Sequence, residues 1–243
     1  MRIDMQALHA GFQETQRGRK SRHSVRDRTR PSMFQYDYLT LQNLSSDIQT
    51  LIAAIPTRFG ARRALDLGSD KCPYRDLLVE HDFTVKCLDV NLAGGADYAG
   101  HAEQTDLPDG SFELVLCTQV LEHCQNPWHA MQEIHRILAP GGYLIFSVPH
   151  VWFYHPHPND HWRFTQEGVV RLCEMGGFAP SMLLSQGGTL LTVGQILNFM
   201  VYGAMGRWGA PAYLILNGIA RAADKCWRND LLCNNFACLA QRI

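Results

Sequence analysis

Short apolar runs alternate with amphipathic stretches from residue 63 onward. Four of the runs have the length of buried strands: RALDL, TVKCLDV, ELVLCT and YLIFSVP. Helical spacing of apolar residues separates them near 74–81 and at about 126–138. Strands that alternate with helices form a mostly parallel sheet covered by helices on both faces. Ligands of such sheets bind beyond the carboxyl ends of the strands, so functional residues are expected just after each run.

The same pattern extends to both sides of this central part. Residues 34–55 space their large apolar side chains at three and four positions, which predicts a lead-in helix. The pair Gly141-Gly142 is interpreted as a helix stop followed by a tight entry into the next strand. EMGGFAPSMLLSQGG predicts a helix, a stop and a strand, and NFACLAQRI predicts the last strand.

A helical insertion, residues 188–229, is expected before this last strand. Its pattern predicts two apolar helices broken at Gly209-Ala210-Pro211. Apolar helices of this kind need cover, so they are expected to form a lid over the site, a homodimer interface or a peripheral membrane contact. Four cations suit either anionic headgroups or the rim of a dimer: Arg207, Arg221, Lys225 and Arg228.

Composition limits the remaining possibilities. A chain of 243 residues with 46% apolar and 19% charged residues is typical of one α/β domain, and a net charge of -1 gives no field that would attract nucleic acid. Positive charge gathers only in residues 1–31, where 16–30 hold seven Arg or Lys, which predicts a flexible basic arm. The first residues lack the apolar core of a signal peptide, so a cytoplasmic location is expected. The eight cysteines include no C-x-x-C pair and are expected to be buried, reduced thiols.

The loop after the first strand, within ALDLGSDKCPY, is the first candidate site. It offers Gly68 alone, whereas a dinucleotide loop needs G-x-G-x-x-G so that backbone amides can approach a pyrophosphate. Asp66 and Asp70 would also repel phosphates, by roughly 1–4 kcal/mol per pair at 4 Å. A cationic ligand with a ribose suits these carboxylates. Asp89, after the second strand, is placed to accept hydrogen bonds from a ribose diol. S-adenosylmethionine is such a ligand, and the pattern favours a nucleoside without phosphates.

The segments LDLGS, CLDVN, DLPDGSFELVLCTQVLEH and EIHRILAPGGYLIFSVP resemble, in order and spacing across 63–149, the motifs of class I S-adenosylmethionine-dependent methyltransferases of the type 11-like subgroup. The resemblance implies an α/β fold with a Rossmann-like, seven-stranded sheet within residues 32–243. It also implies S-adenosylmethionine as cofactor. Asp70 departs from the family's second loop glycine, and is interpreted as a turn residue at positive φ or as a further partner of the ligand amine.

The resemblance also implies which residues hold the cofactor. Asp66 and Gly68 would line the methionine end, Asp89 the ribose and Val90 the adenine. Residues near His101 would close over the adenine edge, although His101 stands where many relatives have Asp. The full set of expected cofactor residues is Asp66, Leu67, Gly68, Ser69, Tyr74, Asp89, Val90, Ala102, Glu103, Thr118, Gln119 and Leu121. For Tyr74, packing at a helix start is an equal alternative.

The segment HVWFYHPHPNDHWRFTQEGVVRL follows the fourth of these strands and is rich in histidine. It resembles a Y-H-P-x-P-x-D-x-W-R-F-T pattern of the same subgroup. A hydroxyl or amine acceptor must lose a proton, and a His or Asp here could take it. The candidates are His155, His157, Asp160 and His161, with His123 as an outsider. Docking of the loop by Trp162, Arg163 and Phe164 is the alternative. The spacing fits no standard ligand pattern, so no metal is expected.

The leading hypothesis is methyl transfer to O or N of a small molecule or glycan. An RNA methyltransferase that grips nucleic acid with the basic arm is an alternative. Against it, C-T-Q-V stands at the end of the run ELVLCT, where an N-P-P-Y-like motif would be expected, and the arm lacks interleaved aromatics, so nucleic acid is not the expected partner. A non-catalytic scaffold of the same fold, with the insertion as its interface, is the other alternative.

Overall fold

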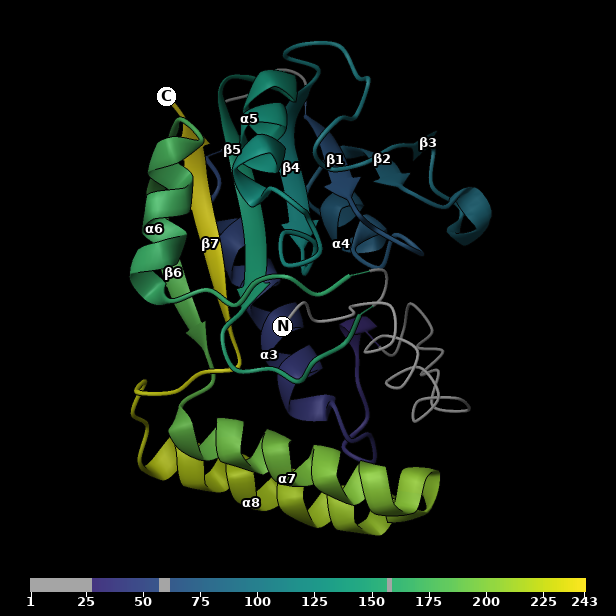
Figure 1. Ribbon diagram of the computed structural model, residues 1–243, viewed down its shortest axis with the longest axis vertical. Coiled ribbons are helices and arrows are strands. Elements are labelled where there is room, and N and C mark those ends of the chain that lie inside the picture. The colour runs from purple at the N-terminus through teal and green to yellow at the C-terminus, as the bar shows by residue number, and fades with distance from the viewer. Residues whose placement is uncertain (1–27, 57–61, 157–158) are drawn as a thin grey trace, which may run out of the picture.

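The computed structural model describes residues 28–56, 62–156 and 159–243, and its centre is one seven-stranded sheet (Figure 1). The strands lie in the order β3-β2-β1-β4-β5-β7-β6. Their bounds are β1 Arg63–Leu67, β2 Thr84–Asp89, β3 Tyr98–Ala99, β4 Phe112–Thr118, β5 Leu138–Pro149, β6 Phe178–Gln186 and β7 Asn235–Arg242. The predicted α/β fold with a seven-stranded sheet is confirmed.

The sheet is parallel except at its last strand in sequence. β1 pairs in parallel with β2 and β4, β2 with β3, and β4 with β5. β7 runs antiparallel between β5 and β6. Parallel neighbours place their carboxyl ends at one edge, so Leu67, Asp89, Thr118 and Pro149 all end there. This edge carries the candidate site.

Helices cover both faces of the sheet, as Figure 1 shows. Their bounds are α3 Tyr38–Ala53, α4 Arg75–Glu80, α5 Pro127–Ile137 and α6 Gln166–Met175, with a short 3₁₀ turn, η1, at Leu92–Gly94. Successive residues of a strand point to opposite faces. Leu65 and Val115 therefore pack with Ile134 of α5, whereas Leu114 packs with Ile48 of α3. The predicted lead-in helix corresponds to α3.

The glycine pair Gly141-Gly142 differs from expectation. Strand β5 begins at Leu138, directly after α5, so Gly141 and Gly142 lie within a strand and do not separate a helix from one. The register there shifts between the pairs Phe112↔Leu138 and Leu114↔Tyr143. Gly141 adopts φ +73, and a Cβ on Gly142 would lie 2.9 Å from the carbonyl of Ala139. The glycine pair therefore forms a bulge, where a strand needs close backbone approach.

The insertion forms a helical hairpin, defined here as α7 Thr189–Met205, the 3₁₀ turn η2 Gly206–Gly209 and α8 Ala210–Cys226. The two helices lie side by side below the sheet in Figure 1. The predicted pair of helices is present, although the break begins at Gly206. By length and composition alone, Thr189–Cys226 meets the criterion for a membrane-crossing helix, with a mean hydropathy of 1.2 and 28% of the apolar window buried.

The expectation of reduced thiols is wrong for one pair. Cys72 and Cys87 form a disulfide, with their Cα atoms 6.2 Å apart. Cys87 is the register partner of Asp66 on β1, and the loop after β1 brings Cys72 over it. This proximity comes from strand pairing, so no sequence spacing reveals it. The other six cysteines are free thiols, and of these Cys226 is exposed.

Candidate functional site

The loop after β1 has the backbone geometry of a close ligand approach. Gly68 adopts φ +72, and a Cβ there would lie 2.4 Å from Cγ2 of Val120. Asp70 adopts φ +48, which confirms its interpretation as a turn residue. Its backbone N–H donates to Oδ2 of Asp89 at 2.8 Å, so the turn also fixes the acid of the neighbouring strand.

A cavity of about 310 Å³ opens over this loop at the carboxyl ends of the strands. Seven of the expected cofactor residues line it: Gly68, Asp89, Val90, Ala102, Glu103, Thr118 and Gln119. His101 lines it too, as the resemblance implies. Arg28 and His123 also reach it, from the end of the basic arm and from the segment after β4. Neither was among the expected cofactor residues.

The other five expected cofactor residues are not among those that line the cavity. Leu67 and Leu121 are fully buried in the core against α5, and Ser69 places its hydroxyl 3.4 Å from Sγ of Cys72. Tyr74 is 1% exposed and packs with the side chains of α3, in agreement with the alternative of a helix-start packing role. Asp66 is 1% exposed.

Near the cavity, the buried carboxyl group of Asp66 and the half-buried one of Asp89 have acceptor positions that no described residue uses. Burial raises the pKa of Asp66 to about 7, although Arg28 and Arg75 oppose this, and its Oδ2 has no hydrogen-bond partner among the described residues. Asp89 accepts from the N–H groups of Asp70 and Asn91. A carboxylate has about four acceptor positions, so Asp89 can still accept from a diol.

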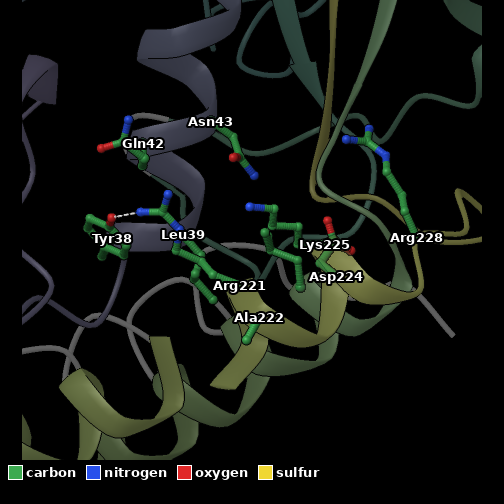
Figure 2. Close-up of a pocket in the computed structure, with 10 residues that line it drawn as sticks. Tyr38, Leu39, Gln42, Asn43, Arg221, Ala222, Asp224, Lys225 and Arg228 are labelled. Carbon is green, nitrogen blue, oxygen red and sulfur yellow. Dashed lines mark hydrogen bonds between the residues drawn. The ribbon is translucent and has the colours of Figure 1, made fainter. Parts of the chain in front are cut away.

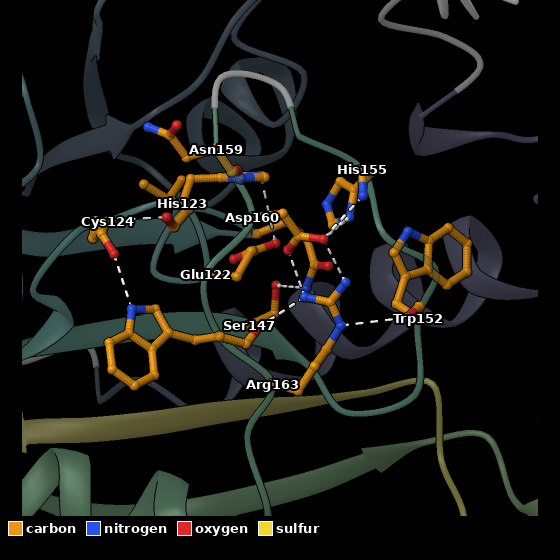
Figure 3. A network of polar contacts seen from close by, with 12 residues as sticks. Glu122, His123, Cys124, Ser147, Trp152, His155, Asn159, Asp160 and Arg163 are labelled. Atoms are coloured by element: carbon orange, nitrogen blue, oxygen red, sulfur yellow. Dashed lines mark hydrogen bonds and ion pairs between the residues drawn. The ribbon is translucent and has the colours of Figure 1, made fainter. Parts of the chain in front are cut away.

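A polar cluster joins the segment after β4 to the loop after β5, as Figure 3 shows, and its His123 also lines the cavity. Its centre is Asp160, whose carboxylate Arg163 grips at both oxygens at 2.5 and 2.7 Å. Burial opposes ionisation of Asp160, but the hydrogen bonds from Arg163 and from the N–H of His155 hold its pKa below the usual value. The Nδ1 atom of His155 lies 3.2 Å from Oδ2 of Asp160 and 2.9 Å from the carbonyl of Phe153.

Glu122 and His123 complete the cluster from the segment after β4. Glu122 is fully buried, and burial raises its pKa to about 8. Its Oε1 lies 3.8 Å from Nε2 of His123. The other ring nitrogen of His123 bonds to the carbonyl of Asn159, and its ring meets that of His155 at 5.1 Å. Burial lowers the pKa of both histidines.

The structure separates the four expected catalytic residues. His155 belongs to the cluster, Asp160 supports it through a closed ion pair, and His161 is exposed, with its backbone N–H bonded to the carbonyl of Glu122. His157 lies outside the described residues. Sequence reasoning missed Glu122. The V-L-E-H segment offered a signal, but only the contact with the later loop reveals that this acid is buried.

The loop is held against the sheet by its aromatic residues, as the alternative hypothesis proposed. Nε1 of Trp162 donates to the carbonyl of Cys124 at 3.0 Å, and its ring meets Trp128 edge-on. The N–H of Phe164 donates to the carbonyl of Pro149. Docking and catalysis are therefore not exclusive, because the docked loop is what brings His155 to His123.

These features fit S-adenosylmethionine. Gly68 leaves room that a Cβ would fill, Asp66 offers an unpartnered buried oxygen to an ammonium, and Asp89 keeps positions for a ribose diol. The apolar Val90 and Ala102 suit an adenine ring.

Sequence comparisons agree with this fit. A methyltransferase domain family model matches residues 77–146. A human thiol S-methyltransferase is 37% identical over 67 residues, 28% of this chain and 25% of that protein. A malonyl-[acyl-carrier protein] O-methyltransferase of Methylococcus capsulatus is 33% identical over 101 residues, 35% of this chain and 37% of that protein. A ubiquinone biosynthesis O-methyltransferase of Paracidovorax citrulli is 26% identical over 131 residues. The chain spans 25–55% of the length of these relatives.

Solved structures show the same fold over nearly the whole chain. A methyltransferase in complex with the Haloferax volcanii Trm112 activator aligns with a TM-score of 0.56 at 15% identity, covering 99% of this chain and 98% of that one. A methyltransferase from Mesorhizobium loti aligns with a TM-score of 0.55 at 17% identity, covering 84% and 100%. The cofactor of this family is S-adenosylmethionine. With the motifs in order along the parallel half of the sheet, residues 77–146 match the methyltransferase domain family, and the chain has the fold of S-adenosylmethionine-dependent methyltransferases.

Proposed function

We propose that the chain methylates an oxygen atom of a small molecule or sugar. One observation carries the proposal: a single cavity joins the cofactor residues Gly68 and Asp89 to His123 of the polar cluster. S-adenosylmethionine supplies an electrophilic methyl group on a sulfonium when it is bound. The cofactor residues hold and orient it, and the cluster places the acceptor oxygen, because positioning alone can contribute several kcal/mol, up to about 7–11 in the best cases.

An oxygen acceptor is favoured over a nitrogen one. The cluster presents the imidazole of His123 to the cavity, and an imidazole acceptor suits a hydroxyl that donates its proton as it reacts. Two of the relatives named above are O-methyltransferases, and one is an S-methyltransferase. These names support transfer to O or S as the chemistry tested first.

Binding of S-adenosylhomocysteine, measured by calorimetry, tests the proposal. We expect micromolar affinity for the wild type, none for NADH, and a loss of about tenfold or more in Asp89→Ala, because that variant loses the diol acceptor. Glu80→Ala, which removes an exposed acid at the end of α4, serves as the matched control and should bind normally. A folded wild-type protein that binds no S-adenosylhomocysteine would contradict the proposal.

The helical hairpin supports a second proposal, contact with an anionic lipid surface. Apolar side chains stand exposed along α7 at Val193, Leu197 and Met200, and along α8 at Ile215 and Ile219. Spacings of three and four place each set on one helix face. Trp208, at the turn, is 75% exposed. Tryptophan at a helix end is typical of membrane interfaces.

A basic cavity of about 440 Å³ lies beside this hairpin, between α3 and α8 (Figure 2). Arg221, Lys225 and Arg228 line it together with one acid, Asp224. In Figure 2 the charged ends of Arg221 and Lys225 point toward α3. An anionic headgroup would suit this charge, so the cavity favours a lipid surface over a second copy of the chain or a lid.

The remaining alternatives stay predictions. RNA methylation depends on residues 1–31, and of these the structure describes only Arg28 onward. A scaffold role is disfavoured by the open cavity over Gly68 and Asp89. A cytoplasmic location also stays a prediction.

A further inference from the structure

Three groups that accept hydrogen bonds face one another beside the cofactor cavity. Glu122, His123 and His155 each offer one ligand atom, and these three atoms all lie within 4.8 Å of one another. Glu122 is 0% exposed, and neither of its oxygens has a hydrogen-bond partner among the described residues. A buried carboxyl group without hydrogen bonds is costly, so its position requires an explanation.

The two imidazoles are already oriented by their other nitrogen. Nδ1 of His123 faces the carbonyl of Asn159, which can only accept, so this nitrogen carries the proton. Nδ1 of His155 faces the carbonyl of Phe153 and the carboxylate of Asp160. In both rings Nε2 is then an unprotonated acceptor. An N–H donated to a carbonyl or carboxylate is the usual support of a metal-bound histidine.

Arg163, the cation nearest in sequence to these groups, has no N–H group left to donate to them. All five N–H positions of Arg163 are accounted for by its hydrogen bonds to Asp160, Trp152, Trp162 and Phe153. Arg163 therefore neutralises Asp160 and has no donor left for Glu122. Both oxygens of Glu122 therefore remain without a hydrogen-bond partner within the described part of the chain.

We propose that Glu122, His123 and His155 bind one divalent transition-metal ion at the edge of the cofactor cavity. Two imidazoles and one carboxylate form a donor set that leaves coordination positions open. Imidazole ligands favour Zn²⁺, Fe²⁺, Co²⁺ or Ni²⁺ over Mg²⁺, which prefers oxygen. The expectation of no metal rested on sequence spacing, which cannot detect a ligand set assembled from the segment after β4 and the loop after β5.

The ion gives the polar cluster a specific role, and this role rests on the proposed methyl transfer. An open position would hold the acceptor oxygen, and an acceptor hydroxyl bound there would release its proton to water at a lower pH than in solution. His123 and His155 would then act as ligands and not as the general base. Asp160 and Arg163 would be positioning residues, because they act through His155.

Titration of untagged, chelator-treated protein with Co²⁺ tests the site without any acceptor. We expect one equivalent to bind with a visible absorption band, Zn²⁺ to displace it, and Mg²⁺ to leave it unchanged. Glu122→Gln and His155→Gln should each weaken Co²⁺ binding by about tenfold or more. His161→Gln, a change to an exposed histidine in the same loop, is the matched control and should bind Co²⁺ as the wild type does.

S-adenosylhomocysteine binding by the same proteins separates the two proposals. Wild-type protein that binds S-adenosylhomocysteine but no Co²⁺ would overturn the metal site and leave the proposed function intact. Wild-type protein that binds Co²⁺ but no S-adenosylhomocysteine would keep the metal site and remove the proposed function. Equal Co²⁺ affinity of wild type, Glu122→Gln and His155→Gln would also overturn the metal site. Retained S-adenosylhomocysteine binding in Glu122→Gln shows that this variant is folded.

Discussion

At the scale of single residues, the site depends on charges that the fold keeps out of water. Asp66 is the clearest case, because burial raises its pKa to about 7 while its register partner is the disulfide-bonded Cys87. Between the unfolded pKa of about 3.9 and the folded value, only the folded protein holds this proton. The stability contribution is therefore complete below about pH 4 and is lost as the pH rises to 7.

We expect Asp66→Asn to reduce this pH dependence. The ligand-free wild type should lose free energy of unfolding between pH 4 and 7, by at most about 1.4 kcal/mol per pH unit from this group. The variant should lose less, and the difference between the two proteins isolates Asp66 from other acids. Urea unfolding at a series of pH values provides the measurement. Parallel pH profiles of the two proteins would show that Asp66 ionises normally in the folded state.

The sequence predicted the residues whose conformation depends on their own backbone or strand. It did not predict the residue whose burial depends on a distant loop. Asp70 could be interpreted as a positive-φ turn residue because that preference belongs to its own backbone. Glu122 could not be recognised as a buried acid, because its burial depends on the loop that carries His155 and Asp160. Asp89 is an intermediate case, because its position at the end of the second strand could be predicted from the order of strands and loops.

At the scale of elements, the helical hairpin is attached by buried amides. Asn217 of α8 is fully buried and donates to the carbonyls of Met33 and Gln35 at 2.8 and 3.0 Å. Its Oδ1 accepts from Asn198 of α7 at 2.7 Å. One side chain thus connects both helices to the segment before α3, so the hairpin's position depends on hydrogen bonds as well as on apolar contact.

We expect Asn217→Ala to loosen this attachment. Leaving these buried groups unpaired should cost about 1–3 kcal/mol. Amide hydrogen exchange of α7 and α8 should then accelerate, by about 5–150-fold where local opening controls it. Exchange in β1 and β4 serves as the internal reference and should change little. Ile215→Ala, at an exposed position of the same helix, is the control. Unchanged exchange in the hairpin would mean that other contacts fix it.

The helices formed where the sequence predicted them, because their apolar periods are long. The prediction failed where strand pairing determines the structure. α3, α5 and both helices of the hairpin formed within the predicted ranges, because their apolar faces extend over several turns. β3, with only two residues, gave no periodic signal and exists through its pairing with β2. Gly141 and Gly142 were misinterpreted because a bulge and a helix stop use the same residue type.

At the scale of the whole molecule, we expect the hairpin to bring the protein to anionic vesicles. Wild-type protein should co-sediment with vesicles that contain phosphatidylglycerol, and added salt should weaken this binding. The double variant Ile215→Ser and Ile219→Ser should bind less, while Val79→Ser, at an exposed apolar residue of α4, should not differ from wild type. A dimer that is lost in the double variant, without vesicle binding, would reassign this face to a second copy.

The strands beside the hairpin give it one further property. Gln186 at the end of β6 and Asn235 at the start of β7 are register partners, so residues 187–234 leave the sheet and return to it at the same point. A connection of this kind can change length or sequence without altering the strands that carry Gly68, Asp89 and Thr118. Evolution or design could therefore exchange the hairpin as a separate module, and change where the protein binds, while the strands around the cavity stay unchanged.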